Sequence, residues 1–230
     1  MRVTICFGGS IVAPDKPNTD LIQEIAKAVH ALKSKKHDVL IVTGGGGPAR
    51  MYIEAAQKFG TPHADLDKIG IDVTRLHARM LISALGDIAE PDPMTTVEAA
   101  VRAAFKNKVP VMGGTTPGQT TDAVAAMLAK ASGSGLLIFF SDVDGVYTAD
   151  PKRDPKAKKI ETMTTRELAK RFATVKAEPG MKTIIDPVAA KLIERSKFKT
   201  LVMGTQEIKR LPKILEGADH SGTTIVPVSE

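Results

Sequence analysis

The sequence predicts an α/β protein with a mostly parallel central sheet sandwiched between helices. Short apolar runs rich in β-branched residues alternate with segments of helical periodicity, and several of these runs end in glycine-rich loops. Buried parallel strands have such continuous apolar runs, and parallel neighbours need a helical crossover between them. With 230 residues, of which 43% are hydrophobic, the chain is long enough for one such domain with a full core.

Six apolar runs are short enough to be buried strands. Helical patterns separate most of them, and the clearest extends from Leu21 to Leu32. The six runs are Val3 to Phe7, Val39 to Thr43, Val109 to Met112, Leu136 to Phe140, Thr200 to Met203 and Thr224 to Val226.

Local signals predict where other helices begin. The segments Thr95 to Glu98 and Thr164 to Glu167 have the spacing of capping boxes. Asp186-Pro187 has an N-cap residue followed by proline at the first helical position, and a further helix is expected to start near Asp67. The segment Asp150 to Ile160 carries two prolines and many basic residues, so we expect an exposed loop that is a lid or a solvated turn.

Composition excludes several classes of protein. Aromatic residues make up 4% of the chain and there is no Trp, which disfavours a surface that stacks the successive bases of a single nucleic-acid strand. The single cysteine, Cys6, excludes an internal disulfide and a cysteine-rich zinc site. No basic leader and no apolar run of roughly 20 residues is visible. We therefore expect a cytoplasmic protein without nucleic-acid or membrane partners, whose net charge of +6 attracts phosphorylated metabolites.

Three glycine-rich loops each follow a predicted strand. They are Gly8 to Ser10, Gly44 to Gly47 and Gly113 to Thr121. Such loops at the carboxyl edge of a parallel sheet let backbone amides approach phosphate oxygens, although any one of them could serve only as a tight turn. Three loops at one edge imply more phosphate than one nucleotide carries. The pattern therefore favours a donor and a phosphorylated acceptor.

Two familiar phosphate-binding motifs nearly match. Gly44-x-Gly46-x-x-Ala49, with Asp65 or Asp67 further along, fits the dinucleotide fingerprint and would predict an NAD-dependent enzyme. That reading leaves the other two loops unexplained. The segment Gly113 to Thr120 has the Walker A glycines, but Gln119 stands where lysine should reach the phosphates, which weakens a P-loop interpretation.

Individual charged side chains allow two readings each. Arg50, just inside the helix after the second loop, is placed either to clamp phosphate or to lie in solvent. Asp67 could accept ribose hydroxyls or cap a helix. Arg75 and Arg79 share a helix face, for which an interface or solvent is expected. Cys6 is expected to be a small buried apolar residue without a paired base.

The predicted strand that ends at Phe140 leads into a polar segment, Ser141 to Pro151. Tyr147 in this segment is one of two tyrosines in the chain. A nucleoside pocket with the ring against the base is one interpretation, and an ordinary acidic turn is the other.

Taken together, the loops resemble the amino acid kinase family, and within it the UMP kinases of archaeal type. The resemblance covers nearly the whole chain. It rests on Val42 to Gly46 with Ala49-Arg50, on Gly113 to Ala123, and on Val143 to Pro151. The last motif is shared across the family, whereas Thr116 to Thr121 points to UMP.

The resemblance implies a role for each matching residue. The ATP phosphate contacts are then Gly9, Ser10, Gly46 and Arg50, and the ATP nucleoside contacts are Ser141, Asp142, Tyr147 and Asp150. The UMP site comprises Gly45, Asp67, Thr116, Pro117, Gly118, Gln119, Thr120, Thr121 and Asp122. Asp144 and Asp186 resemble catalytic carboxylates that organise the reacting groups and magnesium.

The implied reaction is transfer of the γ-phosphoryl group of ATP to UMP, with Mg²⁺ accompanying ATP and no metal site built by the protein alone. The resemblance also implies a homo-oligomer, often a hexamer. Residues 1–230 are expected to form one domain, with an acceptor-binding lobe over roughly 1–132 and an ATP-binding lobe over roughly 133–230.

Two departures from the family pattern matter. Many relatives have a phosphoryl-stabilising lysine where this chain has Cys6, so Arg50, Lys182 or a lysine within 152–159 would have to supply that charge. Asp142 stands where asparagine is common. Two other functions stay open on the same fold: an isopentenyl phosphate kinase, which usually has a histidine where Pro48 to Arg50 offers none, and a non-catalytic nucleotide- or oxyanion-binding protein.

Overall fold

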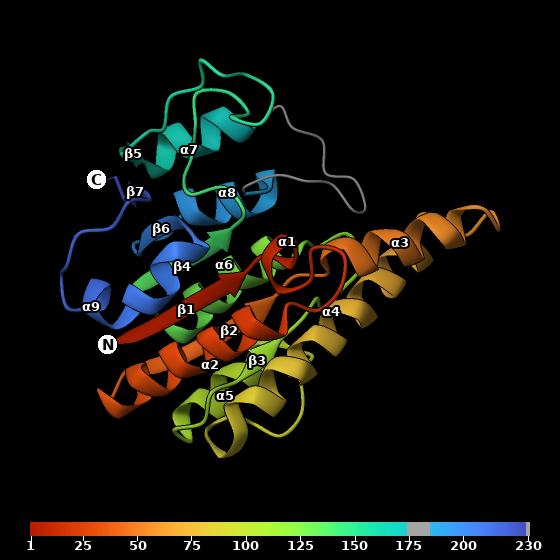
Figure 1. The fold of residues 1–230 in the computed structure, drawn as a ribbon, viewed down its shortest axis with the longest axis horizontal. Coiled ribbons are helices and arrows are strands. Elements are labelled where there is room, and N and C mark those ends of the chain that lie inside the picture. The colour runs from red at the N-terminus through yellow and green to blue at the C-terminus, as the bar shows by residue number, and fades with distance from the viewer. Residues whose placement is uncertain (174–184, 229–230) are drawn as a thin grey trace.

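A seven-stranded sheet with helices on both faces runs through the computed structural model, which describes residues 1–173 and 185–228 (Figure 1). The strand order is β3-β2-β1-β4-β6-β7-β5, and the only antiparallel pair in the sheet described is β6 with β7. The predicted fold class is therefore confirmed. The strands are β1 (Arg2–Phe7), β2 (Asp38–Thr43), β3 (Val111–Met112), β4 (Leu136–Ser141), β5 (Thr162–Thr164), β6 (Lys199–Gly204) and β7 (Thr223–Val226).

All six predicted strands are present, and two details differ. The strand expected from Val109 begins at Val111, and Val109 makes only an isolated bridge with Ala89. Pro110 between them has no N–H to donate to a ladder, which accounts for the shorter strand. The three-residue strand β5 was not predicted, because Thr162–Thr164 has no apolar run to signal it.

Alternate residues of β1 enter two different cores. Val3, Ile5 and Phe7 pack with α2, α4 and α9, whereas Cys6 faces the second core, which includes residues of α5, α6 and α8. Both faces of the sheet are therefore covered. The helices are α1 (Gly9–Val12), α2 (Thr19–Ser34), α3 (Gly46–Gln57), α4 (His63–Leu85), α5 (Val97–Phe105), α6 (Thr121–Ser132), α7 (Thr165–Phe172), α8 (Pro187–Glu194) and α9 (Leu211–Leu215), with 3₁₀ turns η1 (Gly86–Ile88) and η2 (Thr205–Arg210).

Two of the four predicted helix starts are confirmed. The capping box at Thr164 and Glu167 opens α7, and Asp186 caps α8 ahead of Pro187. The box expected at Thr95 is wrong by one residue, because Thr96 caps α5 by accepting a hydrogen bond from the amide of Ala99. Adjacent threonines offer two similar caps, and sequence spacing does not distinguish them.

The helix expected to start near Asp67 begins at His63, so Asp67 lies within its second turn. Leu66 is the one large apolar residue of the first turn of α4 and is buried, whereas His63 and Ala64 are exposed, so this turn carries no periodic signal. The ends of α3 and α4 that meet near residue 60 project from the body of the molecule (Figure 1). None of the helices in the described part of the chain combines the length and the apolar character needed to cross a bilayer.

Candidate functional site

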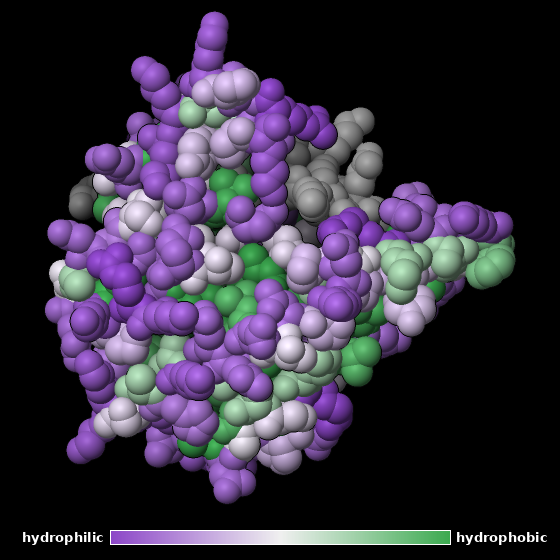
Figure 2. Space-filling model, viewed as in Figure 1, coloured by the Kyte–Doolittle hydropathy of each residue, from purple (hydrophilic) through white to green (hydrophobic). Residues whose placement is uncertain are grey.

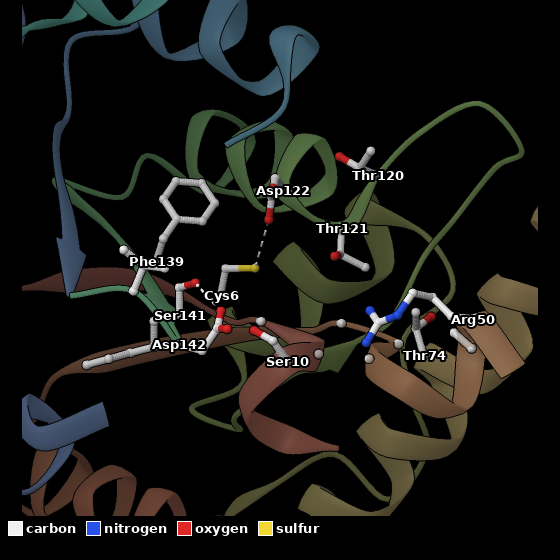
Figure 3. A pocket seen from close by; sticks show the side chains of 18 of the residues that line it. Cys6, Ser10, Arg50, Thr74, Thr120, Thr121, Asp122, Phe139, Ser141 and Asp142 are labelled. Carbon is white, nitrogen blue, oxygen red and sulfur yellow. Dashed lines mark hydrogen bonds between the residues drawn. The ribbon is translucent and has the colours of Figure 1, made fainter. Parts of the chain in front are cut away.

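A cavity of about 790 Å³ lies at the carboxyl ends of β1, β2 and β4 (Figure 3). After β3 the chain returns to the other side of β1, where β4 pairs with it, so the direction of strand addition reverses between β2 and β4. The crevice outside such a reversal is where open α/β sheets bind ligands. The three predicted glycine loops all meet there, as expected.

The first two glycine loops touch each other through their backbones. A Cβ added to Gly9 would lie 2.0 Å from the amide nitrogen of Gly46, and one added to Gly44 would lie 2.3 Å from that of Gly9. Side chains at these positions would separate the loops, so glycine is required for the close approach. Gly46 also begins the twelve-residue helix α3, whose N-terminal dipole favours an anion. Of the first amides of this helix, that of Gly47 already donates to the carbonyl of Ala13 at 2.9 Å, and Pro48 has none.

Helix α4 holds the third loop in place. The Thr74 hydroxyl accepts a hydrogen bond from the amide of Gly114 at 2.7 Å, and Asp67 Oδ2 accepts one from the amide of Gly118 at 2.7 Å. Arg75 donates to the carbonyls of Gly114 and Thr115 at 3.2 and 3.3 Å. The guanidinium of half-buried Arg75 therefore supports this loop, a contact that the expected interface or solvent position did not include.

Two carboxyl groups and a thiol meet where α6 begins. The Cys6 thiol donates to Asp122 Oδ1 with an Sγ to Oδ1 distance of 3.7 Å (Figure 3). Thr120, the N-cap of α6, donates its hydroxyl proton to Asp186, which also accepts from the amides of Val188 and Ala189. Cys6 is buried as predicted, and its hydrogen bond to Asp122 is a polar contact that the sequence did not indicate.

Burial and the nearby carboxylate of Asp186 raise the pKa of Asp122 to about 7. Burial, followed by the charge of Asp122, also raises the pKa of the Cys6 thiol well above its ordinary value. The thiol therefore stays protonated and acts as a weak hydrogen-bond donor rather than as a nucleophile. This end of the cavity carries no cation opposite its carboxyl groups among the residues described.

The segment after β4 forms the opposite side of the cavity. Asp142 accepts hydrogen bonds from Ser141, at 3.2 Å, and from Lys152. Partial burial acts to raise the pKa of Asp142, but hydrogen bonds from Lys152 and Ser10 outweigh it and lower that pKa. The Tyr147 hydroxyl donates to Asp144 Oδ1 at 2.7 Å, and Lys159 donates to Asp144 Oδ2 at 2.8 Å.

The structure brings most of the predicted site residues to one cavity. Thr116, Pro117, Asp144 and Asp186 are not among its lining residues. Asp144 instead accepts a hydrogen bond from Tyr147, and Asp186 accepts one from Thr120. Both carboxylates therefore contact residues that line the cavity without lining it themselves. The predicted residues that line the cavity are Gly9, Ser10, Gly45, Gly46, Arg50, Asp67, Gly118, Gln119, Thr120, Thr121, Asp122, Ser141, Asp142, Tyr147 and Asp150.

Some lining residues carry no signal in the sequence that would place them at the site. Thr74 lies in the middle of a long helix, and Arg171 and Phe172 end α7, more than 20 residues after Tyr147. The Nη2 atom of Arg171 donates to the carbonyl of Tyr147 at 2.6 Å. None of these residues belongs to a loop motif, so only the tertiary fold reveals them.

Three cationic side chains line the cavity among the described residues: Arg50, Lys152 and Arg171. Arg50 lies on α3 with its guanidinium directed into the central space that Ser10 also faces (Figure 3). Lys182, one of the candidates for the missing first-strand charge, lies outside the described residues. Lys159 does not line the cavity, because its ammonium group is paired with Asp144.

Comparisons with known proteins agree with this geometry. A uridylate kinase from Pyrococcus abyssi is 42% identical over 227 residues, covering 99% of this chain and all of the relative. A uridylate kinase from Methanococcoides burtonii is 42% identical over 219 residues, covering 95% of this chain and 93% of the relative. The crystal structure of uridylate kinase from Archaeoglobus fulgidus superposes with a TM-score of 0.86 at 37% identity, covering 98% of this chain and 100% of that one.

An aspartate kinase from Synechocystis shares the fold, with a TM-score of 0.73 at 20% identity, and matches this chain over 40% of its own length. The family model described as "Amino acid kinase family" matches residues 1–204. With a matched region of that extent and the three glycine loops at one sheet edge, the chain belongs to the amino acid kinase family.

Proposed function

We propose that this chain is a UMP kinase that transfers the γ-phosphoryl group of ATP to UMP, giving UDP and ADP. The observation that carries the proposal is that all three glycine loops, Gly8 to Ser10, Gly44 to Gly47 and Gly113 to Thr121, contribute lining residues to the same cavity. The names of relatives about 40% identical over nearly the full chain support the same substrates.

The two substrates would occupy the two sides of the cavity. We place UMP on the side of α4 and α6, where Asp67 and the segment Gly118 to Asp122 line the wall. ATP would lie on the side of β4, against Ser141, Asp142 and Tyr147. This division corresponds to an acceptor-binding lobe over roughly 1–132 and an ATP-binding lobe over roughly 133–230.

The reaction needs little covalent chemistry from the protein. An oxygen of the UMP phosphate attacks the γ-phosphorus of ATP in line, and the bond from that phosphorus to the β–γ bridging oxygen breaks. Amides of the first two loops and the Arg50 guanidinium would stabilise the charge on the transferring group. Asp144 and Asp186 would contribute by holding Tyr147 and Thr120 rather than by touching the substrates.

Mg²⁺ would accompany ATP and neutralise part of the charge of its phosphates. The described residues contain no group of three or more His, Cys, Asp or Glu side chains arranged to hold a metal ion. They do place separate carboxylates in the cavity wall, including Asp122 and Asp150. Such a site fits a magnesium ion held mainly by phosphate oxygens and water, which is its common mode in kinases.

A second copy of the chain is the proposed partner of the projecting arm formed by α3 and α4. Met51, Tyr52 and Phe59 are exposed there, and 84% of the surface of Phe59 is accessible. Figure 2 shows hydrophobic colours along this arm on an otherwise mostly hydrophilic face. Exposed apolar side chains grouped in this way favour association. Light scattering tests this proposal, because the wild type should have a larger molecular mass than Phe59→Glu.

The substrate assignment is tested by coupled ADP-release assays with UMP, CMP, GMP, AMP and isopentenyl phosphate as acceptors. Turnover with UMP well above that with the others is expected. Turnover with another acceptor and none with UMP would overturn the assignment. Tight binding of both ATP and UMP without turnover in the presence of Mg²⁺ would instead indicate a nucleotide-binding protein.

A further inference from the structure

Asp142 places a carboxylate on the side of the cavity that the proposed function assigns to ATP. It follows β4 directly and lies beside Ser10 of the first glycine loop (Figure 3). A carboxylate facing a polyphosphate chain opposes binding by charge repulsion, and partial burial strengthens that repulsion. A cation of the protein beside Asp142 would cancel this charge.

Lys152 supplies that charge in the structure. Its ammonium group forms an ion pair with Asp142, and both side chains line the cavity. The backbone amide of Lys152 also donates to Asp150 Oδ1 at 2.9 Å, which fixes the turn that carries the lysine. Lys152 thus bridges two carboxylates on the same side of the cavity.

The other lysines of this loop do not have that position. Lys159 pairs with Asp144, while Lys156 and Lys158 are exposed and lie away from the cavity lining. Of the lysines within 152–159, Lys152 is the one that lines the cavity.

We propose that Lys152 is a positioning residue of the nucleotide site, which neutralises Asp142 and holds its carboxylate against Ser10 so that a polyphosphate can lie beside it. The inference rests on the proposed function for the identity of the nucleotide. It assigns to the loop over 150–160 a direct part in ATP binding, through the ion pair with Asp142.

A double-mutant cycle tests the inference. The dissociation constant of a non-hydrolysable ATP analogue with Mg²⁺ is measured by calorimetry for the full chain and for Lys152→Met, Asp142→Asn and the double variant. Lys152→Met should weaken binding about tenfold, because it leaves the carboxylate uncompensated in a partly exposed site. The same lysine change in the Asp142→Asn background should weaken binding by less than about threefold, because the charge that Lys152 neutralises is then absent at position 142.

Lys156→Met is the matched control, since it removes the same charge from the same loop outside the cavity. Lys152→Arg should recover most of the affinity, because it restores a cation at this position. The loss caused by Lys152→Met should also shrink when KCl is raised from about 50 to about 500 mM, as expected for a charge effect. A purely structural defect would not show this salt dependence.

Equal affinity of Lys152→Met and the wild type would overturn the inference. So would an equal loss in the two backgrounds, because the lysine would then act without Asp142. The calorimetric readout does not need UMP or turnover. A wild-type protein that binds the ATP analogue but fails to phosphorylate UMP would therefore contradict the proposed function while the cycle still decides the role of Lys152.

Discussion

At the scale of single residues, Arg50 is the cation of the described chain that we propose acts on the transferring group. It extends from the first turns of α3 into the space shared by the first two glycine loops. Arg50→Ala should lower kcat/KM by an amount equivalent to a few kcal/mol of transition-state stabilisation, with a smaller effect on UMP binding. Steady-state kinetics against both substrates measure this. Arg79→Ala, which removes an exposed arginine paired with Asp92, is the control, and unchanged turnover of Arg50→Ala would remove Arg50 from the mechanism.

Asp122 makes stability depend on pH. Its pKa is raised from 3.8 to about 7 in the folded protein, mainly by burial and then by Asp186. The folded state therefore binds this proton more tightly than the unfolded chain does. The stabilisation that the protonated Asp122 contributes is present below about pH 4 and is lost as the pH rises to about 7. Asp122→Asn should flatten the decrease in urea midpoint between pH 5 and pH 8. Asp72→Asn, which changes an exposed carboxylate, should leave this decrease unchanged. An equal slope of urea midpoint against pH in the wild type and Asp122→Asn would contradict the raised pKa of Asp122.

At the scale of elements, α4 would link the proposed UMP site to helix packing. Asp67, in its second turn, accepts from the amide of Gly118 and so holds the acceptor loop at the cavity. Asp67→Ala should raise the KM for UMP more than it lowers kcat, because the loop loses its anchor while the reacting groups stay in place. Asp65→Ala removes a nearby exposed carboxylate that pairs only with Lys68 in the described structure. An effect confined to the KM for ATP would show that the acceptor site lies elsewhere.

Helices and strands differ in how strongly the sequence signals where they begin. Buried strands and the capped starts of α7 and α8 were predictable because their signals lie within a few consecutive residues. The start of α4 and the strand β5 were not, because a first turn with one large apolar residue and a three-residue strand carry no periodic pattern. The loop supports supplied by Thr74 and Arg75 depend on contacts about 40 residues apart, which spacing alone does not reveal.

The same distinction applies to the candidate site. Its glycine loops could be predicted, since they follow strands that must end at one edge of a parallel sheet. The pairing of Cys6 with Asp122 and of Asp142 with Lys152 could not, because each joins side chains whose distance is set by the packing of α6 or by the course of the loop over 150–160.

At the scale of the whole molecule, the cavity lies at the end of β1, the strand that has β2 on one side and β4 on the other. The loops after β1 and β2 touch through Gly9 and Gly46, and the amide of Gly8 donates to the carbonyl of Phe140 on β4 at 2.9 Å. Loops in direct backbone contact therefore carry both proposed substrate sites.

This arrangement predicts that donor and acceptor bind together. The cavity of about 790 Å³ is shared, but the two sides draw on different lining residues. Saturating UMP should therefore leave the dissociation constant of a non-hydrolysable ATP analogue within about threefold of its value in the absence of UMP, whereas competition for one site would raise it in proportion to the UMP concentration. Calorimetric titration with and without UMP measures this directly.

A crystal soaked with both compounds should show two molecules with their phosphates facing each other between Arg50 and Asp122. A single ligand extending across all three glycine loops would refute a phosphoryl transfer between two bound nucleotides.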